Sequence, residues 1–230
     1  MNIGIIGYGK MGEEIEKIAL QKGHNILLKI NTQNLDSLNL KNISKIDVAI
    51  EFSTPKSSFY NINFCIKNKI PVVCGTTGWL NRLEEVEHLC VKYKTSFIYS
   101  PNFSIGVNLF FEINNYVAKL MSNTDYKFDI VETHHTTKKD QPSGTAIKLL
   151  NDICQYNKEK RDSNIVIQSN RVGNTTGEHI VNYSSEIDEI QLIHKANNRI
   201  GFAEGAVLAA EFIKNKTGFF TMKDIITNLK

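Results

Sequence analysis

The first hundred residues alternate between short apolar runs and longer amphipathic segments. The apolar runs predict strands at residues 2–7, 25–31, 47–52, 72–74 and 96–99. Between them, the spacing of apolar side chains and a proline at residue 71 predict helices at residues 11–22, 56–69 and 80–94. Strands that are almost continuously apolar are buried on both faces, and repeated strand–helix units place their strands in parallel. This half of the chain therefore predicts a parallel sheet with helices on both faces.

The pattern changes after residue 103. Residues 106–121 predict one long helix with an apolar face, and a series of strands follows, interrupted by one helix at residues 145–154. The predicted strands are residues 127–133, 164–169, 178–183 and 189–194. Strands in series favour a mixed, mostly antiparallel sheet, so we expect a second, α+β domain. Helices predicted at residues 202–214 and 222–229 close the chain.

These elements predict two domains. Residues 1–104 form the first, which we expect residues 200–230 to complete, and residues 105–199 form the second.

Composition adds mainly exclusions. The 230 residues hold 27 Lys and Arg against 24 Asp and Glu, and no dense basic tract, so nucleic acid is not an expected partner. No apolar run reaches the ~20 residues of a membrane span, and the strand predicted at the N-terminus leaves no room for a signal peptide. The four cysteines lack CxxC spacing, which predicts reduced, partly buried thiols of a cytoplasmic protein.

A glycine-rich turn joins the first strand to the first helix. It consists of Gly7, Tyr8, Gly9, Lys10, Met11 and Gly12, a GxGxxG pattern. The first glycine permits the tight turn, the second lets a pyrophosphate approach the backbone, and the third lets helix and strand pack closely. The following helix N-terminus offers unpaired N–H groups to phosphate. The turn therefore predicts a dinucleotide-binding, Rossmann-like domain, and a glycine turn without a ligand is the alternative.

The end of the second predicted strand bears on the choice of nucleotide. Sites that prefer NAD place Asp or Glu there to bind the ribose 2′-hydroxyl. This chain instead has Lys29 near the strand end and no carboxylate before Asp36. Lys29 can attract a 2′-phosphate, so we expect NADPH to bind at least as well as NADH. A solvated strand end is the alternative interpretation of Lys29.

The most informative stretch is residues 132–146, ETHHTTKKDQPSGTA, which leaves a strand, crosses a polar loop and enters a helix. The paired His134 and His135 can hold or transfer a proton near neutral pH, and Lys138 can donate one or neutralise a carboxylate. The turn at residues 143–145 begins a helix whose N–H groups and hydroxyls can bind an anion. These groups suit a small dicarboxylate that is to be protonated. No metal is expected, because zinc would need further ligands, and an ordinary capped loop is the alternative.

This stretch resembles the signature of the dihydrodipicolinate reductase (4-hydroxy-tetrahydrodipicolinate reductase) family, E-x-HH-xx-K-x-D-x-PSGTA, with Gln141 where the family commonly has Ala. The resemblance covers nearly the whole chain. The other similar segments are residues 7–12 and 74–78 as cofactor loops, 100–108 as the segment between domains, and the late matches 177–179 and 199–206.

The resemblance implies NAD(P)H-dependent reduction of 4-hydroxy-tetrahydrodipicolinate, via dihydrodipicolinate, to tetrahydrodipicolinate in the diaminopimelate route to lysine. It implies that His134 is the proton donor and acceptor and Lys138 a proton donor. The implied ligands of the substrate carboxylates are His135, Lys138, Ser143, Gly144 and Thr145. The implied dinucleotide contacts are Gly7 to Gly12, Gly75, Thr76, Thr77, Ser100, Pro101, Asn102 and Phe103, with Phe52 and Ser53 lining the nicotinamide pocket.

Several alternatives stay open at this point. Phe52 and Ser53 are equally explained as the end of a buried strand. His179 and His194 are expected to be core-edge histidines satisfied by hydrogen bonds. The family implies a homotetramer built by the second domain, although an intramolecular core explains the same apolar surfaces. For function, the alternatives are a related dehydrogenase acting on another imine or dicarboxylate, and a non-catalytic nucleotide-binding regulator.

Overall fold

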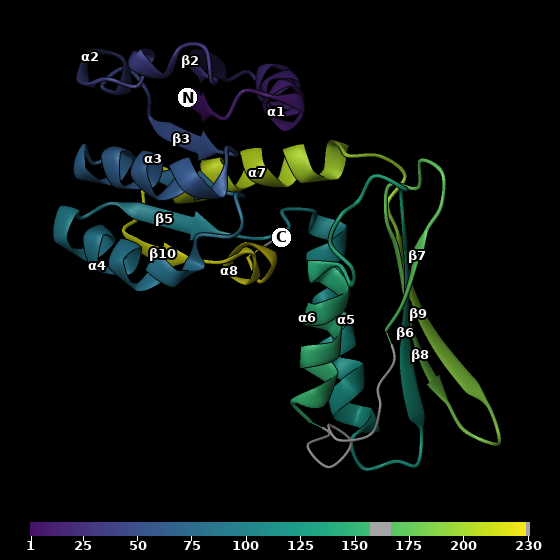
Figure 1. Cartoon of the computed structure of the whole chain (residues 1–230). Helices are drawn as coiled ribbons and strands as arrows, with labels where there is room; N and C mark the ends of the chain where they lie inside the picture. The colour runs from purple at the N-terminus through teal and green to yellow at the C-terminus, as the bar shows by residue number, and fades with distance from the viewer. Residues whose placement is uncertain (157–166, 229–230) are drawn as a thin grey trace. The chain divides into compact units, whose positions relative to one another are not determined.

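The computed structural model describes residues 1–156 and 167–228, which divide into two units (Figure 1). The first unit is built from two separate parts of the chain, Met1–Ile105 and Ile200–Lys230, and Gly106–Arg199 between them forms the second.

The first unit contains a six-stranded, entirely parallel sheet with the strand order β10-β5-β4-β3-β1-β2. Its strands are β1 (Asn2–Ile6), β2 (Asn25–Ile30), β3 (Val48–Glu51), β4 (Val72–Cys74), β5 (Ser96–Tyr99) and β10 (Gly218–Phe220). The predicted parallel sheet is thus confirmed. The sequence did not predict β10, because three residues carry too little periodicity and the strand exists through its pairing with β5.

Helices cover both faces of this sheet. They are α1 (Lys10–Gln21), α7 (Ile200–Ile213) and α8 (Met222–Ile226) on one face, and α2 (Leu40–Ile43), α3 (Pro55–Lys67) and α4 (Leu83–Tyr93) on the other. Alternate residues of β1 supply the two cores, since Ile5 packs with α1 and α7 whereas Ile6 packs with α2 and α3. None of the helices within the described ranges is long and apolar enough to cross a membrane.

Some elements of this unit differ from the sequence prediction in their bounds or were not predicted. The helix predicted at residues 80–94 is a 3₁₀ turn, η2 (Leu80–Arg82), followed by α4, and a second such turn, η1 (Leu35–Ser37), precedes α2. The helix predicted at residues 222–229 ends at Ile226, and residue 229 lies outside the described residues. Helix ends depend on local capping and fray easily, so such shifts leave the architecture unchanged.

The second unit is a four-stranded mixed sheet with two helices on one face (Figure 1). Its strands are β6 (Lys127–His134), β7 (Ile167–Arg171), β8 (Glu178–Ser184) and β9 (Glu189–Lys195), in the order β7-β6-β8-β9. Only β6 and β7 are parallel, which confirms the predicted mostly antiparallel sheet. The helices are α5 (Ile105–Met121) and α6 (Gly144–Cys154). Of the strand predicted at residues 164–169, residues 164–166 lie outside the described residues.

The order of the first sheet determines where its ligand site lies. β1 has β2 on one side and β3 on the other, so the strand order reverses between β1 and β3. In open α/β sheets, ligands bind at such a reversal, beyond the carboxyl ends of the strands. The segments that begin at Gly7 and at Phe52 follow the carboxyl ends of β1 and β3, on either side of this reversal.

Candidate active site

The glycine-rich turn after β1 has the geometry that a pyrophosphate requires. Gly7 has φ +95°, and a Cβ there would lie 2.1 Å from the backbone oxygen of Phe52, so only glycine fits. A Cβ on Gly12 would lie 3.1 Å from the backbone oxygen of Gly7, so the absence of a side chain at Gly12 lets α1 approach the turn closely. At Gly9, by contrast, no described atom lies within 4 Å of an added Cβ. This open side at the N-terminus of α1 is where a phosphate can reach the backbone.

The loops after β3, β4 and β5 meet one another, and each contains residues predicted to bind the dinucleotide. A Cβ on Gly75 would lie 2.3 Å from the ring of Phe52, and that ring lies 5.8 Å from the ring of Phe103. The backbone N–H of Ser53 donates to Oγ1 of Thr76 at 2.8 Å. These contacts bring the three loops together at the carboxyl ends of β3, β4 and β5, as a shared cofactor site requires.

The remaining predicted cofactor residues lie on two of these loops. Ser100 donates through Oγ to the carbonyl of Asn102 at 2.6 Å, and the side-chain oxygen of Asn102 accepts from the backbone of Ser104 at 2.9 Å. These bonds hold the turn after β5. Thr77 and Pro101 are exposed, so their side chains face solvent at the loop surfaces.

A buried carboxylate that the sequence analysis did not single out supports these loops. Glu51, the last residue of β3, is fully buried and accepts hydrogen bonds from Ser53, Ser58, Asn61 and Cys74. All of these donors are neutral, and Ser58 and Asn61 come from α3. An acidic residue at the end of an otherwise apolar strand is the sequence signal that points to such an arrangement. Glu51 therefore holds in place Ser53, which is one of the two residues predicted to line the nicotinamide pocket.

Lys29 lies beside the glycine-rich turn, but another residue balances its charge. Its ammonium lies 2.5 Å from a carboxylate oxygen of Glu16 on α1 and 5.0 Å from the centre of the Tyr8 ring. The Tyr8 hydroxyl also donates to Glu16. The hydrogen bonds from Lys29 and Tyr8 lower the pKa of Glu16, which keeps it ionised. Lys29 can thus reach a nucleotide phosphate only in competition with Glu16.

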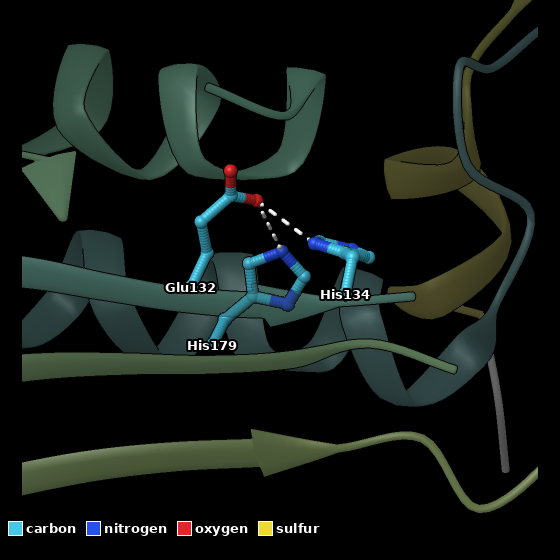
Figure 2. Close-up of side chains that lie close together, drawn as sticks. All are labelled: Glu132, His134 and His179. Carbon is cyan, nitrogen blue, oxygen red and sulfur yellow. Dashed lines mark ion pairs between the residues drawn. The ribbon is translucent and has the colours of Figure 1, made fainter. Parts of the chain in front are cut away.

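In the second unit, a buried histidine and a buried carboxylate lie at the start of the predicted substrate motif, residues 132–146 (Figure 2). Glu132 and His134 lie two residues apart on β6, so both point to the face of the sheet covered by α5 and α6. Nδ1 of His134 lies 3.0 Å from Oε2 of Glu132. His179, opposite Glu132 on β8, places its Nε2 3.9 Å from the same oxygen.

The second oxygen of Glu132 is also occupied. It accepts from the backbone N–H of Ser143 at 3.0 Å and from the guanidinium of Arg171 at 3.1 Å. Burial opposes ionisation, but hydrogen bonds from His134 and Ser143 outweigh it and hold the pKa of Glu132 well below its usual range. Burial and the neighbouring His134 lower the pKa of His179 to about 3, so His179 is neutral at pH 7. The cluster therefore holds an ionised carboxylate beside a fixed positive charge.

Glu132, His134 and His179 are also the residues in this part of the chain that could hold a metal ion. One ligand atom from each lies within 4.8 Å of the others, and all three residues are buried. The guanidinium of Arg171 on the same carboxylate opposes a cation there, since like charges repel at this distance. That no metal is bound stays a prediction.

The loop after β6 places the other predicted substrate-binding residues. Nδ1 of His135 lies 2.7 Å from the hydroxyl of Thr137, and Lys138 forms an ion pair with Asp140 at 2.8 Å. Burial and the positive charge of Arg199 lower the pKa of His135, so it acts as a neutral hydrogen-bonding group. A carboxylate that binds Lys138 must therefore compete with Asp140.

Helix α6 begins where the substrate-binding turn was predicted. Ser143 is its N-cap, and Oγ of Ser143 accepts from the backbone N–H of Ala146 at 3.2 Å. A Cβ on Gly144 would meet no described atom within 4 Å, so an anion can approach the first turn, which continues into Thr145. The structure thus joins Ser143 to His134 through Glu132.

Sequence reasoning assigned no role to Glu132 or Arg171. Besides Glu132, Arg171 binds the carbonyl of Asp140 at 2.6 Å, so it connects the buried cluster with the Lys138 loop. We expected hydrogen bonds to satisfy the ring nitrogens of His179 and His194, and this is correct for Nε2 of His179 but not for Nδ1 of either residue. Nε2 of His179 lies 3.3 Å from Oγ of Ser143, whereas Nδ1 of either histidine has no hydrogen-bond partner in residues 1–156 and 167–228.

Comparison with known families gives two matches in series. The model described as the N-terminus of dihydrodipicolinate reductase matches residues 1–103, and the one described as its C-terminus matches residues 106–226. Together these matches span almost the whole chain.

Curated relatives that align with most or all of this chain are named 4-hydroxy-tetrahydrodipicolinate reductase. A 4-hydroxy-tetrahydrodipicolinate reductase of Christiangramia forsetii is 46% identical over 238 aligned positions, covering 100% of this chain and 99% of the relative. One from Buchnera aphidicola is 37% identical and covers 91% and 84%, respectively.

Among solved structures, a dipicolinate-bound dihydrodipicolinate reductase from Paenisporosarcina sp. TG-14 has the same fold. It superposes with a TM-score of 0.81 at 23% identity, over 100% of this chain and 99% of that one.

Proposed function

This chain belongs to the dihydrodipicolinate reductase family, and we propose that it catalyses the reduction of 4-hydroxy-tetrahydrodipicolinate with NAD(P)H in the diaminopimelate route to lysine. The observation that carries the proposal is the second unit's buried pair of His134 and Glu132, joined through Ser143 to the N-terminus of α6. The proton donor, His134, and the anion site at the start of α6 are thus both held by the side chain of Glu132. The first unit supplies the glycine-rich dinucleotide turn.

The residues divide the reaction between binding and proton transfer. Bound NAD(P)H supplies a hydride to the ring carbon conjugated with the imine. The 4-hydroxyl leaves with one ring proton as water, which gives the conjugated dihydrodipicolinate that accepts the hydride. A single proton at the neighbouring electron-rich position then completes the reduction, and His134 donates it, with Lys138 as the second acidic group that can do so. The substrate carboxylates bind the first turn of α6, at Ser143, Gly144 and Thr145, where N–H groups and the helix dipole favour negative charge. The ammonium of Lys138 and neutral His135 complete this carboxylate site.

A coupled assay tests the function directly. The protein is mixed with dihydrodipicolinate synthase, pyruvate and aspartate semialdehyde, and oxidation of NADPH or NADH is followed by absorbance. We expect oxidation that depends on every component. A folded protein that binds the dinucleotide but oxidises none would contradict the proposal, and turnover of a different imine in preference would favour a related dehydrogenase.

We expect the cofactor preference to depend on the balance between Lys29 and Glu16. Replacing Glu16 with Gln removes the charge that competes for Lys29, so the KM for NADPH should fall by about two- to fivefold, the range of a partly exposed ion pair. The KM for NADH should change little, because NADH lacks the 2′-phosphate. Glu14→Gln, on the same helix and paired with Lys17, is the matched control. Equal KM changes for both nucleotides, or a strong preference for NADH in the wild type, would show that Lys29 has no such role.

We propose that the enzyme is a homotetramer assembled through the sheet of the second unit. The face opposite α5 and α6 carries Val131, Ile180 and Ile193 in one row across three strands, and Ile193 is 56% exposed. An apolar row on an otherwise polar sheet face suits burial against a second copy of the chain.

A charge in this row should disrupt assembly. We expect Ile193→Asp to reduce the mass measured by sedimentation equilibrium from that of a tetramer to that of a smaller species, because an unpaired carboxylate would be buried at the contact. Val91→Asp, a comparable change at an exposed position of α4, should leave the mass unchanged. A wild-type monomer, or a tetramer that tolerates Ile193→Asp, would contradict the assignment.

We place the enzyme in the cytoplasm. The four cysteines are all free and buried, and burial raises the pKa of Cys90 to about 12, so its thiol is unreactive at neutral pH. Such thiols support a reducing compartment.

A further inference from the structure

The two oxygens of Glu132 serve different partners. Oε2 faces Nδ1 of His134 at 3.0 Å, while Oε1 accepts from the backbone of Ser143 and from Arg171. The two atoms are close without being aligned as a hydrogen bond, but a bare nitrogen lone pair at this distance would be repelled by the carboxylate, which favours the tautomer with the proton on Nδ1 of His134. Nε2 is then the nitrogen of His134 that can exchange a proton with a substrate.

The absence of a side chain at Gly177 leaves the other edge of the His134 ring open. A Cβ on Gly177 of the neighbouring chain segment would lie 3.1 Å from Nε2 and 3.3 Å from Cδ2 of His134. The ring of His179 packs against it, with the two ring centres 5.0 Å apart and the planes 73° apart. Only 8% of His134 is exposed, so the Glu132 carboxylate and the His179 ring hold the His134 ring in place, while Nε2 lies on the edge that Gly177 leaves open.

The other charged groups near His134 and Glu132 are already paired. Arg171 on β7 and Glu132 on β6 balance each other, and Lys138 and Asp140 in the loop form a second balanced pair. His179 on β8 is neutral and adds no charge. Oε2 of Glu132 is therefore the charged atom that faces the His134 ring, 3.0 Å from Nδ1.

We propose that Glu132 is the positioning residue of the reductase: it fixes the His134 ring with Nε2 free for proton transfer and ties that ring to the substrate-binding turn through the Ser143 N–H. The role rests on the proposed function, since it requires His134 to protonate the substrate. Glu132 is fully buried with its oxygens against His134, Ser143 and Arg171, so it acts through these neighbours and not by contact with the substrate. It sets the distance between the proton donor and the carboxylate site because both bind the same buried side chain.

The decisive variant is Glu132→Gln, which keeps the size of the side chain and removes its charge. We expect kcat to fall on the order of 10²-fold, because an amide can turn either its oxygen or its NH₂ towards Nδ1 and so no longer enforces one tautomer and orientation of the His134 ring. The KM for NADPH should remain that of the wild type, since the dinucleotide turn is in the other unit.

Isotope effects separate positioning from damage to the fold. Proton transfer should become slower than hydride transfer in Glu132→Gln. The solvent deuterium isotope effect on kcat should therefore rise, while the effect of deuterium at the transferred position of the nicotinamide should shrink. If Glu132 only stabilised the fold, the variant would lose activity, but its solvent and nicotinamide deuterium isotope effects would stay those of the wild type.

The matched control is Glu178→Gln, the same change on β8, where the side chain pairs with Lys195 rather than with the cluster. Its kcat and isotope effects should equal those of the wild type. If Glu132→Gln keeps kcat within about threefold of the wild type, or loses it with unchanged isotope effects, the positioning role is overturned while the function stands. An inactive wild type would instead overturn the proposed function.

A second variant decides the matter if Glu132→Gln does not fold. Glu132→Asp keeps the charge but withdraws the carboxylate by roughly 1.5 Å, the length of one C–C bond, so it cannot hold His134 and Ser143 together. We expect a lower kcat with a raised solvent isotope effect. Wild-type isotope effects in this variant would overturn the proposal.

Discussion

Replacing His134 with Gln should lower kcat by about 10²- to 10⁴-fold, the usual contribution of a general acid, while the protein remains folded. Glutamine can still donate an amide hydrogen to Oε2 of Glu132, so the buried carboxylate keeps a partner. It has no proton that it can transfer at neutral pH. Steady-state kinetics in the coupled assay, with unfolding temperature as the measure of folding, give the result.

The control for this experiment is His88→Gln, at an exposed position on α4 in the other unit. It should have wild-type kcat and KM. A His134→Gln enzyme with near-normal turnover would show that another group supplies the proton. A kcat that falls together with the unfolding temperature would indicate damage to the sheet instead.

Replacing Lys138 with Ala should raise the KM for the substrate and lower kcat together. One ammonium is expected to bind a carboxylate and to donate a proton, so its removal affects both parameters. Hydrogen bonds to charged groups contribute about 1.5–3 kcal/mol, which corresponds to a rise in KM of roughly 10- to 100-fold. Initial rates over a range of substrate concentrations, at saturating NADPH, measure the two parameters separately.

Lys139→Ala is the matched control, because Lys139 is the exposed neighbour of Lys138 in the same loop. It should leave KM and kcat unchanged. The Asp140 carboxylate, which pairs with Lys138, gives a further comparison. Asp140→Asn frees the ammonium for the substrate, so the KM should not rise. A rise in KM for Asp140→Asn, or an unchanged one for Lys138→Ala, would show that the ion pair positions the loop and does not bind substrate.

The glycine-rich turn was predictable because its chemistry is local. The spacing of Gly7, Gly9 and Gly12 follows from backbone requirements within a few residues, and the positive φ of Gly7 agrees with them. The strands β1, β3, β4 and β5 were predictable for the same reason, since burial on both faces requires apolar residues almost throughout. The N-cap at Ser143 is also a short-range feature.

The partners of the predicted residues were not predictable. Lys29 stands out near the end of β2, but the sequence does not reveal that Glu16, on the preceding helix α1, takes up its charge. The strand β10 has three residues and depends on β5 for its hydrogen bonds. Such contacts join segments whose separation along the chain carries no periodic signal.

The sequence by itself determined which groups can perform the chemistry: a glycine turn for phosphate, two histidines and a lysine for protons, and a helix N-terminus for carboxylates. Only the tertiary structure decided how these groups are supported. The register of β6 against β7 places Arg171 opposite His134, and that against β8 places His179 opposite Glu132. Register depends on the packing of whole strands over a shared core, so the buried network around Glu132 exists only once the sheet has formed.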